Sequence, residues 1–303
     1  MCSSDLTSRV MTRLSRPAAV AARHRKAEQA RVKAGAPHRV EYFHQVDEGY
    51  SFLAAQMLER LAARYDIELH CHLVRGQEGK NAPEPQLLAQ LARVDSHQIA
   101  PGYGLTFPDH PEAPNPDLVQ TATEILAAQS NADFLRVAAR VSEALWRDDA
   151  GSLAQLAEEF GTASTEAAAA AVEAGTAKRR ELKHYSGAMF YYGGEWYWGV
   201  DRLYHLEQRL AALGADTEPG APLIAPRPDV DLAGHRDMGH YTLELYASLR
   251  SPYTAVIFDR AVAFAAEAGV KLTLRPVLPM VMRGVPATRE KGMYIFMDAA
   301  REA

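Results

Sequence analysis

Two short motifs carry the residue types that could do chemistry. The first reads Glu48-Gly49-Tyr50-Ser51 and the second reads Ser251-Pro252-Tyr253-Thr254. Each motif follows a strand-like run and precedes a helix-like one, so each is predicted to lie at a helix N-terminus. Unpaired backbone N–H groups and the helix dipole favour negative charge there. We therefore take Glu48 and Ser251 as the candidate catalytic residues.

Both motifs belong to a repeat with a constant offset of 203 residues. A period this long exceeds the roughly 20 to 50 residues of solenoid repeats. We therefore predict a duplicated domain whose second copy is truncated where the sequence stops at Ala303, and we interpret the sequence as a fragment. Among the matched positions are Glu41 with Glu244, Tyr50 with Tyr253, Leu69 with Leu272, and Asp95 with Asp298.

The composition excludes several classes of protein. With 303 residues, of which 48% are hydrophobic and 23% are charged, the chain is long enough for two globular cores. Its net charge of -5 disfavours nucleic acid as a partner. No apolar run approaches the roughly 18 residues of a membrane span, and the first forty residues are too basic for a secretory segment. We expect a cytoplasmic protein without a membrane partner.

The cysteines and histidines offer little chemistry of their own. Cys2 and Cys71 are too few and too far apart for a disulfide framework or a C-x-x-C pair, so any thiol chemistry must come from a ligand. His70 and His72 share one face of a predicted strand, but no third ligand follows at a useful spacing. We predict no metal site.

The local pattern predicts the elements that must position these motifs. Residues 40–46 and 67–74 read as strands, and residues 51–65 between them read as one helix. The two strands should be parallel, because a strand, helix, strand unit of this size makes a crossover. A hairpin over residues 188–198 and a helix from Asp201 to Leu213 close the pattern. Between the second strand and the hairpin lie five predicted helices, at residues 85–98, 116–129, 132–146, 152–160 and 166–174. Gly161 and Gly175 are predicted to end the last two of them.

This order of elements predicts an α/β thioredoxin-like fold with an all-helical insertion, followed by the front half of a second copy. The predicted organisation is a basic arm (1–37), a complete domain (38–214) with its insertion at about 84–185, a Pro-rich linker (215–239) and a truncated second domain (240–303). The basic arm could form a surface helix that contacts an acidic partner, or remain as solvated or frayed charge.

The chain resembles a known family in three segments: the run Tyr-Ser-Phe-Leu-Ala-Ala-Gln from Tyr50, Phe107-Pro108 followed by Pro114-Asn115, and the stretch from Gly194 to Leu203. It looks like the DsbA-like branch that contains 2-hydroxychromene-2-carboxylate isomerases and kappa-class glutathione transferases. The resemblance implies glutathione as the cofactor. It also implies a serine at the helix N-terminus that donates a hydrogen bond to the glutathione thiolate.

The resemblance assigns roles to residues of both copies. Ser251 matches the family's serine, with Tyr253 and Thr254 beside it. In the first copy Glu48 takes the serine's place, where a carboxylate would raise the pKa of a thiolate. Ala188 stands where the family has a cis-proline. Asp201, after Val200, matches the aspartate that binds the γ-glutamyl end of glutathione in relatives, although a helix N-cap or a first-turn carboxylate would equally explain it.

Two functions of different classes follow. In the first, the protein is a glutathione-dependent isomerase, transferase or oxidoreductase-type enzyme that acts on a small organic substrate. In the second, it is a degenerate thioredoxin-like scaffold or binding module. The expected partners are a small-molecule substrate and a second copy of the chain in a homodimer.

Overall fold

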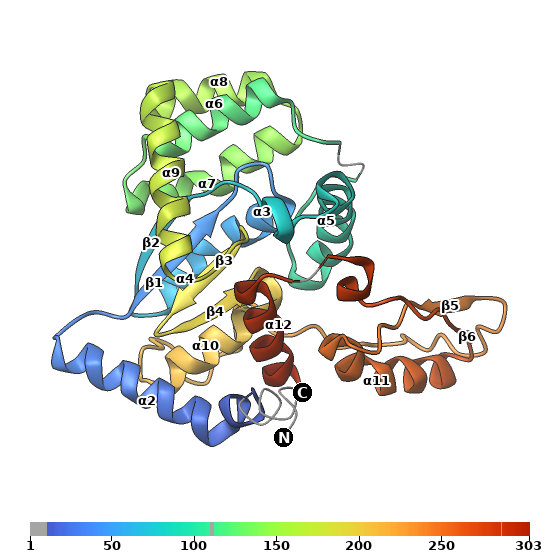
Figure 1. Ribbon diagram of the computed structural model, residues 1–303. Coiled ribbons are helices and arrows are strands. Elements are labelled where there is room, and N and C mark those ends of the chain that lie inside the picture. Colours follow the sequence, from blue (N-terminus) through green and yellow to red (C-terminus); the bar gives the residue numbers. More distant parts are fainter. Residues whose placement is uncertain (1–10, 110–111, 286) are drawn as a thin grey trace. The chain divides into compact units, whose positions relative to one another are not determined.

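The structure is a computed structural model that describes residues 11–109, 112–285 and 287–303. The chain divides into two compact units. The larger unit comprises residues 22–78 and 84–228, and the smaller unit comprises residues 79–83 and 229–303 together with the chain up to Ala21. Figure 1 shows the helices and strands of both units.

The larger unit is built on a four-stranded sheet with the order β2-β1-β3-β4. Strand β1 pairs in parallel with β2 and antiparallel with β3, which pairs antiparallel with β4. This strand order, with a helix after β1 and another after β4, is the predicted thioredoxin-like fold. The strands span Arg39–His44 (β1), Glu68–Leu73 (β2), Met189–Tyr192 (β3) and Glu195–Trp198 (β4).

The connection between β1 and β2 differs from the prediction of one helix. It consists of α3 (Gly49–Ala55) and α4 (Leu58–Arg64). At the break, the side chain of Gln56 donates to the carbonyl of Thr106 at 2.9 Å and accepts from its N–H at 3.1 Å. Gln56 is thus bonded to the neighbouring loop, and an apolar pattern at helical spacing does not reveal such a partner.

The helical insertion is confirmed, with one correction. Gly161 ends α8 as predicted, with a φ of 78°. Gly175 was predicted to end the next helix, but α9 continues through it. A Cβ at Gly175 would lie 2.1 Å from the carbonyl oxygen of Leu73, so the glycine allows α9 to approach β2. The helices are α5 (Pro85–Ile99), α6 (Pro116–Ala127), α7 (Asn131–Trp146), α8 (Ala150–Phe160) and α9 (Thr165–Glu181), with short 3-10 turns at Gly79–Asn81 (η1) and Ala100–Tyr103 (η2).

The chain after β4 closes the larger unit. A 3-10 turn, η3 (Val200–Arg202), leads into α10 (Leu203–Ala212). The buried carboxylate of Glu207 on α10 accepts hydrogen bonds from the N–H groups of Ile224 and Ala225, at 2.7 and 2.9 Å. The first part of the predicted linker is therefore anchored to the larger unit.

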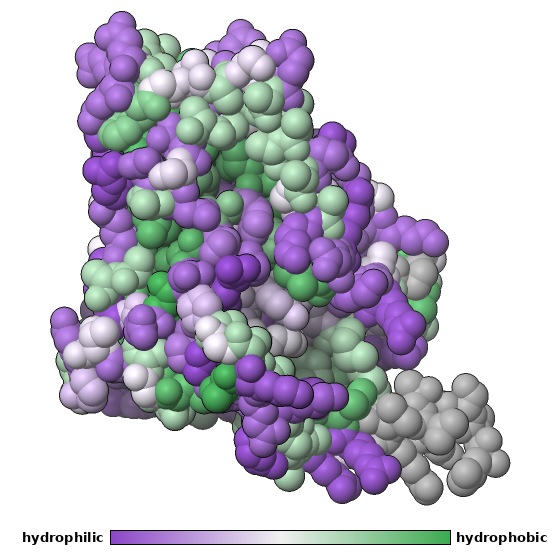
Figure 2. All heavy atoms as spheres, turned by 90° about the vertical axis from the view of Figure 1, so that its left-hand side faces the viewer, coloured by the Kyte–Doolittle hydropathy of each residue, from purple (hydrophilic) through white to green (hydrophobic). Residues whose placement is uncertain are grey.

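The basic arm contains a helix, α2 (Pro17–Lys33), that buries none of its residues. Arg31 forms an ion pair with Glu28, and Nε2 of His24 lies 2.8 Å from Oε2 of Glu195. Figure 2 shows the face of the molecule on the left of Figure 1, where hydrophilic and hydrophobic side chains are intermixed. The helix is thus a surface element, whereas its contact with an acidic partner stays a prediction.

The smaller unit contains a second strand, helix, strand arrangement. Strand β5 (Thr242–Leu245) pairs in parallel with β6 (Lys271–Leu274), and α11 (Pro252–Ala268) connects them. The register is that of the larger unit: Thr242 pairs with Lys271, as Arg39 pairs with Glu68. A 3-10 turn, η4 (Met280–Arg283), and α12 (Arg289–Glu302) follow. In the described part of the chain, no helix is both long and apolar enough to cross a membrane.

Candidate functional site

Glu48 lies at the predicted place, immediately before α3. It is the N-cap residue with extended backbone, but its carboxylate makes no capping hydrogen bond. Instead, its Oε2 atom accepts a hydrogen bond from the hydroxyl of Ser51 at 2.7 Å. The carboxylate is thus turned away from the helix N–H groups and toward a side chain one turn along the helix.

Ser51 joins three segments of the larger unit through one oxygen atom. Its side chain is fully buried. While its hydroxyl donates to Glu48, its Oγ atom accepts from the N–H of Gln45 and from the N–H of Ala188, both at 3.1 Å. The end of β1, the start of α3 and the start of β3 therefore meet at this hydroxyl.

The environment of Glu48 changes its acidity. Burial raises the pKa of Glu48 from its ordinary value of 4.5 to about 7. The hydrogen bond from Ser51 opposes this shift, the charge of Asp47 adds to it, and the charge of Arg179 opposes it. A carboxyl group with a pKa of about 7 can either donate or accept a proton near neutral pH.

The loop before β3 lies against this carboxylate. A Cβ on Gly187 would lie 2.6 Å from Oε2 of Glu48, so only glycine fits there without displacement. Ala188 follows with a φ of 50°, and no described peptide bond is cis. Its N–H donates to Ser51 and its carbonyl accepts from the N–H of Gly199 at 2.7 Å. Its backbone is therefore already paired within the larger unit.

A second cluster adjoins the start of α3. The hydroxyl of Tyr50 donates to Oδ2 of Asp95 on α5 at 2.7 Å, and its ring makes an edge contact with Trp198. Burial, then Asp95, raise the pKa of Tyr50 far above its ordinary value, and the charge of Asp201 contributes. The structure therefore brings Asp201 into the electrostatic surroundings of Tyr50.

Asp201 and Val200 occupy η3. Asp201 is exposed and its carboxylate pairs with Arg202 at 3.0 Å, while Val200 is buried. The residue that precedes η3 as its N-cap is Gly199. Of the two structural explanations of Asp201, the first-turn carboxylate is therefore confirmed and the N-cap is wrong. Its binding of a γ-glutamyl group, and a role for Val200 in cofactor binding, stay predictions.

Ser251 is the N-cap residue of α11 in the smaller unit. Its backbone is extended, with φ −87° and ψ 120°, and its hydroxyl makes no capping hydrogen bond. The residue is partly exposed. Because α11 has 17 residues, its dipole is fully developed at this end. The Ser251 hydroxyl is thus available to a ligand at a positive helix end.

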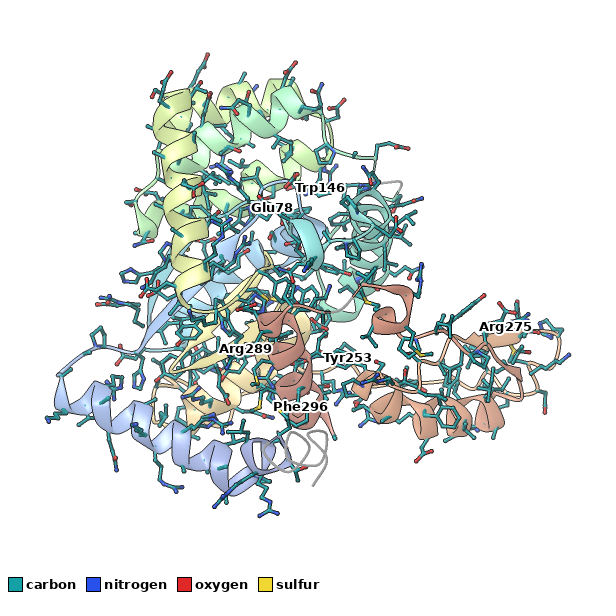
Figure 3. All side chains as sticks on the ribbon, viewed as in Figure 1. Glu78, Trp146, Tyr253, Arg275, Arg289 and Phe296 are labelled. Carbon is teal, nitrogen blue, oxygen red and sulfur yellow. The ribbon has the colours of Figure 1, made fainter. Side chains whose placement is uncertain are left out.

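The two residues predicted to assist Ser251 are held within the smaller unit. The hydroxyl of Tyr253, labelled in Figure 3, donates to Oδ2 of Asp298 on α12 at 2.8 Å. The Oγ1 atom of Thr254 accepts from the N–H of Ser248 at 3.2 Å. These bonds reproduce Tyr50 with Asp95 and Ser51 with the N–H of Gln45, each shifted by 203 residues.

Sequence reasoning overlooked three contributors to the site of the larger unit. Ser51 could have been found, because the repeat places it opposite Thr254 and so retains a hydroxyl at both positions. Gly187 is required only by the approach of a loop to Glu48. Arg179 comes from α9, more than a hundred residues away, and is buried with its Nε atom lacking a hydrogen-bond partner among the described residues. Neither of the last two has a local sequence signal.

The histidines and cysteines lie apart from these clusters. His72 pairs with Glu41 at 2.7 Å and His70 with Glu68 at 3.5 Å. In residues 11–109, 112–285 and 287–303, no group of three or more His, Cys, Asp or Glu is placed to hold a metal ion. Cys71 is a free thiol, and Cys2 lies outside the described residues.

No protein-family model matches the chain, and no curated protein matches it either. Among solved structures, it is similar to a 2-hydroxychromene-2-carboxylate isomerase, with 21% identity over 58% of this chain and 96% of that one, and a TM-score of 0.43. It is also similar to a probable DsbA oxidoreductase from Streptomyces coelicolor, with 14% identity over 61% of this chain and 94% of that one, and a TM-score of 0.44. Because both likenesses are weak, the fold assignment rests on the strand order and directions of the sheet.

Proposed function

We propose that the protein is a DsbA-like, glutathione-dependent isomerase or transferase that acts on a small organic substrate in the cytoplasm, and that its smaller unit is a tandem copy of the strand, helix, strand part of the larger one. The observation that carries the proposal is the hydroxyl of Ser251, which sits at the N-terminus of a long helix and caps none of its N–H groups. The matching register and the matching hydrogen bonds of the two units support the duplication.

The residues of the smaller unit fit a thiolate ligand. When bound, glutathione would supply a sulfur nucleophile. Ser251 would donate a hydrogen bond to the sulfur, and the helix dipole of α11 would favour its negative charge. Thr254 and Tyr253 would act indirectly, because their side chains hold the start of α11 against Ser248 and Asp298.

The residues of the larger unit do not fit a thiolate. Glu48 would place a carboxylate beside it, and the Ser51 hydroxyl already donates to Glu48. Both backbone groups of Ala188 are also occupied. Because these polar groups already have hydrogen-bond partners within the larger unit, they favour the second candidate function. In it, the larger unit is a scaffold or binding module and derives no activity from its own helix N-terminus.

Isothermal titration of the full chain with reduced glutathione tests the proposal. The unaltered chain and Glu48→Ala should bind, whereas Ser251→Ala should lose at least tenfold in affinity. Ser248→Ala is the matched control, because it removes a hydroxyl three residues away while its N–H still donates to Thr254. Absence of binding to the unaltered chain, or equal binding by Ser251→Ala, would reject glutathione at this site and favour the scaffold.

A further inference from the structure

A buried arginine lies near the carboxyl ends of the two parallel strands of the larger unit. Strands β1 and β2 end at His44 and Leu73, and α9 lies beside β2 (Figure 1). From α9, the side chain of Arg179 reaches the chain that follows β2, where its Nη1 atom donates to the carbonyl of Arg75 at 2.9 Å. Arg179 therefore lies where ligands commonly bind in α/β proteins, beyond the carboxyl ends of parallel strands.

One edge of the Arg179 guanidinium has no partner. The Nε and Nη2 atoms of an arginine form a planar fork of N–H donors that matches a carboxylate. The Nη1 atom donates to Arg75, whereas neither Nε nor Nη2 donates to any residue that the structure describes. Only 3% of Arg179 is exposed, so bulk water does not hydrate the fork freely. Because buried polar groups are normally hydrogen-bonded, this fork calls for a bound partner.

The carboxyl of Glu48 lies in the electrostatic surroundings of Arg179. The two charges act on each other, but within the described part of the chain no ion pair or hydrogen bond joins the two side chains. The Oε2 atom of Glu48 accepts from Ser51, while its Oε1 atom has no hydrogen-bond partner among the described residues. Glu48 is also partly exposed, so a small molecule can reach it from solvent. An oxygen of Glu48 and the fork of Arg179 thus both remain for a third group.

The charges of these two side chains favour an anion. Burial raises the pKa of Glu48 to about 7, so about half of the carboxyl is protonated at pH 7 and can donate a hydrogen bond. Burial lowers the pKa of Arg179 to about 10, which still leaves the guanidinium charged. With Glu48 protonated the pair carries one positive charge, which a carboxylate would neutralise.

The other titratable or charged groups nearby do not reverse this charge. Those that act on Glu48 or Arg179, or on which these two act, are Asp47, Glu78, Arg180, His184, Tyr42 and Tyr50. Asp47, Glu78 and Arg180 are exposed, so water screens their charges. Burial lowers the pKa of His184 to about 3, and it raises the pKa of both tyrosines, so these three side chains are neutral near pH 7.

We propose that Arg179 and Glu48 form a binding site for a small carboxylate in the larger unit. The carboxylate accepts two hydrogen bonds from the Nε and Nη2 atoms of Arg179 and a third from the protonated Oε1 atom of Glu48. The larger unit then acts as a binding module, as in the second candidate function. Neither glutathione nor Ser251 is required, so the site is separate from that of the smaller unit.

Acetate titrations of the full chain, followed by saturation-transfer NMR at constant ionic strength, test this site. Acetate should bind at pH 6 and about tenfold more weakly at pH 8, because the protonated fraction of Glu48 falls from about nine-tenths to about one-tenth. Arg179→Lys keeps a positive charge but lacks the fork, so it should lose at least tenfold in affinity at pH 6. Arg180→Lys changes the exposed neighbour on α9 and is the matched control, which should bind as the unaltered chain does.

Two further variants do not depend on how Arg179→Lys folds. Glu48→Gln has an amide that donates at every pH, so it should bind acetate equally at pH 6 and pH 8. Ser251→Ala should bind acetate as the unaltered chain does, which distinguishes this site from anion binding at the N-terminus of α11.

Three results would overturn the carboxylate site. If acetate does not bind the unaltered chain at pH 6, water alone satisfies Arg179. If Ser251→Ala abolishes acetate binding, the anion lies in the smaller unit. If Glu48→Gln keeps the pH dependence of the unaltered chain, the carboxyl of Glu48 does not contact the ligand. None of these results depends on whether glutathione binds at Ser251.

Discussion

Glu48 and Ser51 form a self-contained pair at the position where the sequence suggested reactive chemistry. The carboxyl receives the serine hydroxyl at 2.7 Å, and the serine oxygen receives two backbone N–H groups. The hydroxyl of the serine therefore has its partners without any ligand. The same pair joins β1, α3 and the start of β3, which gives it a structural role that is independent of catalysis.

The raised pKa of Glu48 predicts a pH dependence of stability. The folded state keeps a proton up to about pH 7, whereas the unfolded state releases it near pH 4.5. Between these values the folded state binds more protons, so the free energy of unfolding falls as pH rises and levels off above about pH 7. The stabilisation lost over this range would be at most about 3 kcal/mol.

Urea denaturation between pH 4.5 and 8 measures this effect. Glu48→Gln should abolish the fall, because the amide does not titrate. The matched control, Asp47→Asn, changes the neighbouring exposed carboxylate and should retain most of it. If Glu48→Gln and the unaltered chain show parallel pH profiles, the carboxyl of Glu48 is ionised throughout and is not shielded from water.

At the scale of elements, the contact between α9 and β2 depends on Gly175. In the middle of a helix glycine usually destabilises relative to alanine, by about 1 kcal/mol. Here an added Cβ would meet the carbonyl oxygen of Leu73 at 2.1 Å, and a backbone atom cannot move aside without displacing the strand. In a Gly175→Ala variant, the cost of this steric contact should therefore exceed the gain in helix propensity.

Chemical denaturation should accordingly show that Gly175→Ala destabilises the larger unit by about 2 kcal/mol or more. Gly151→Ala in α8 is the control, since its Cβ would meet nothing closer than 3.4 Å, and it should be neutral or slightly stabilising. Equal effects of the two substitutions would mean that α9 can shift away from β2 at little cost.

The contrast between predicted and observed elements has a physical basis. Local periodicity identified all four strands of the larger sheet and the helices of the insertion, because most of them bury one face. The exception is α5, whose Leu87, Leu91 and Val94 are exposed. It could not show that α3 ends at Gln56, whose side chain bonds to Thr106, or that Gly175 serves packing and not termination. The repeat located Glu48 and Ser251, but the partners of Glu48 from distant segments, Gly187 and Arg179, become neighbours only on folding.

At the scale of the whole molecule, the segment from Asp229 to Asp237 connects the two units without forming a helix or strand. Nearly all of its residues are exposed. By contrast, the chain just before it is fixed, because Ile224 and Ala225 donate to the buried carboxylate of Glu207. Exposed backbone with few hydrogen bonds is the preferred substrate of proteases.

We therefore expect brief digestion with a protease that cleaves before aspartate to cut first at Asp229, Asp231 or Asp237, as mass spectrometry of the fragments would show. Because every such cut lies beyond Ala225, the larger fragment keeps the anchor to Glu207 and should still unfold cooperatively. A variant with asparagine at all three positions should resist this first cut. First cleavage within the helical insertion would show that the segment from Asp229 to Asp237 is not the most accessible part of the chain. A larger fragment that unfolds without cooperativity would show that the larger unit depends on the rest of the chain for its fold.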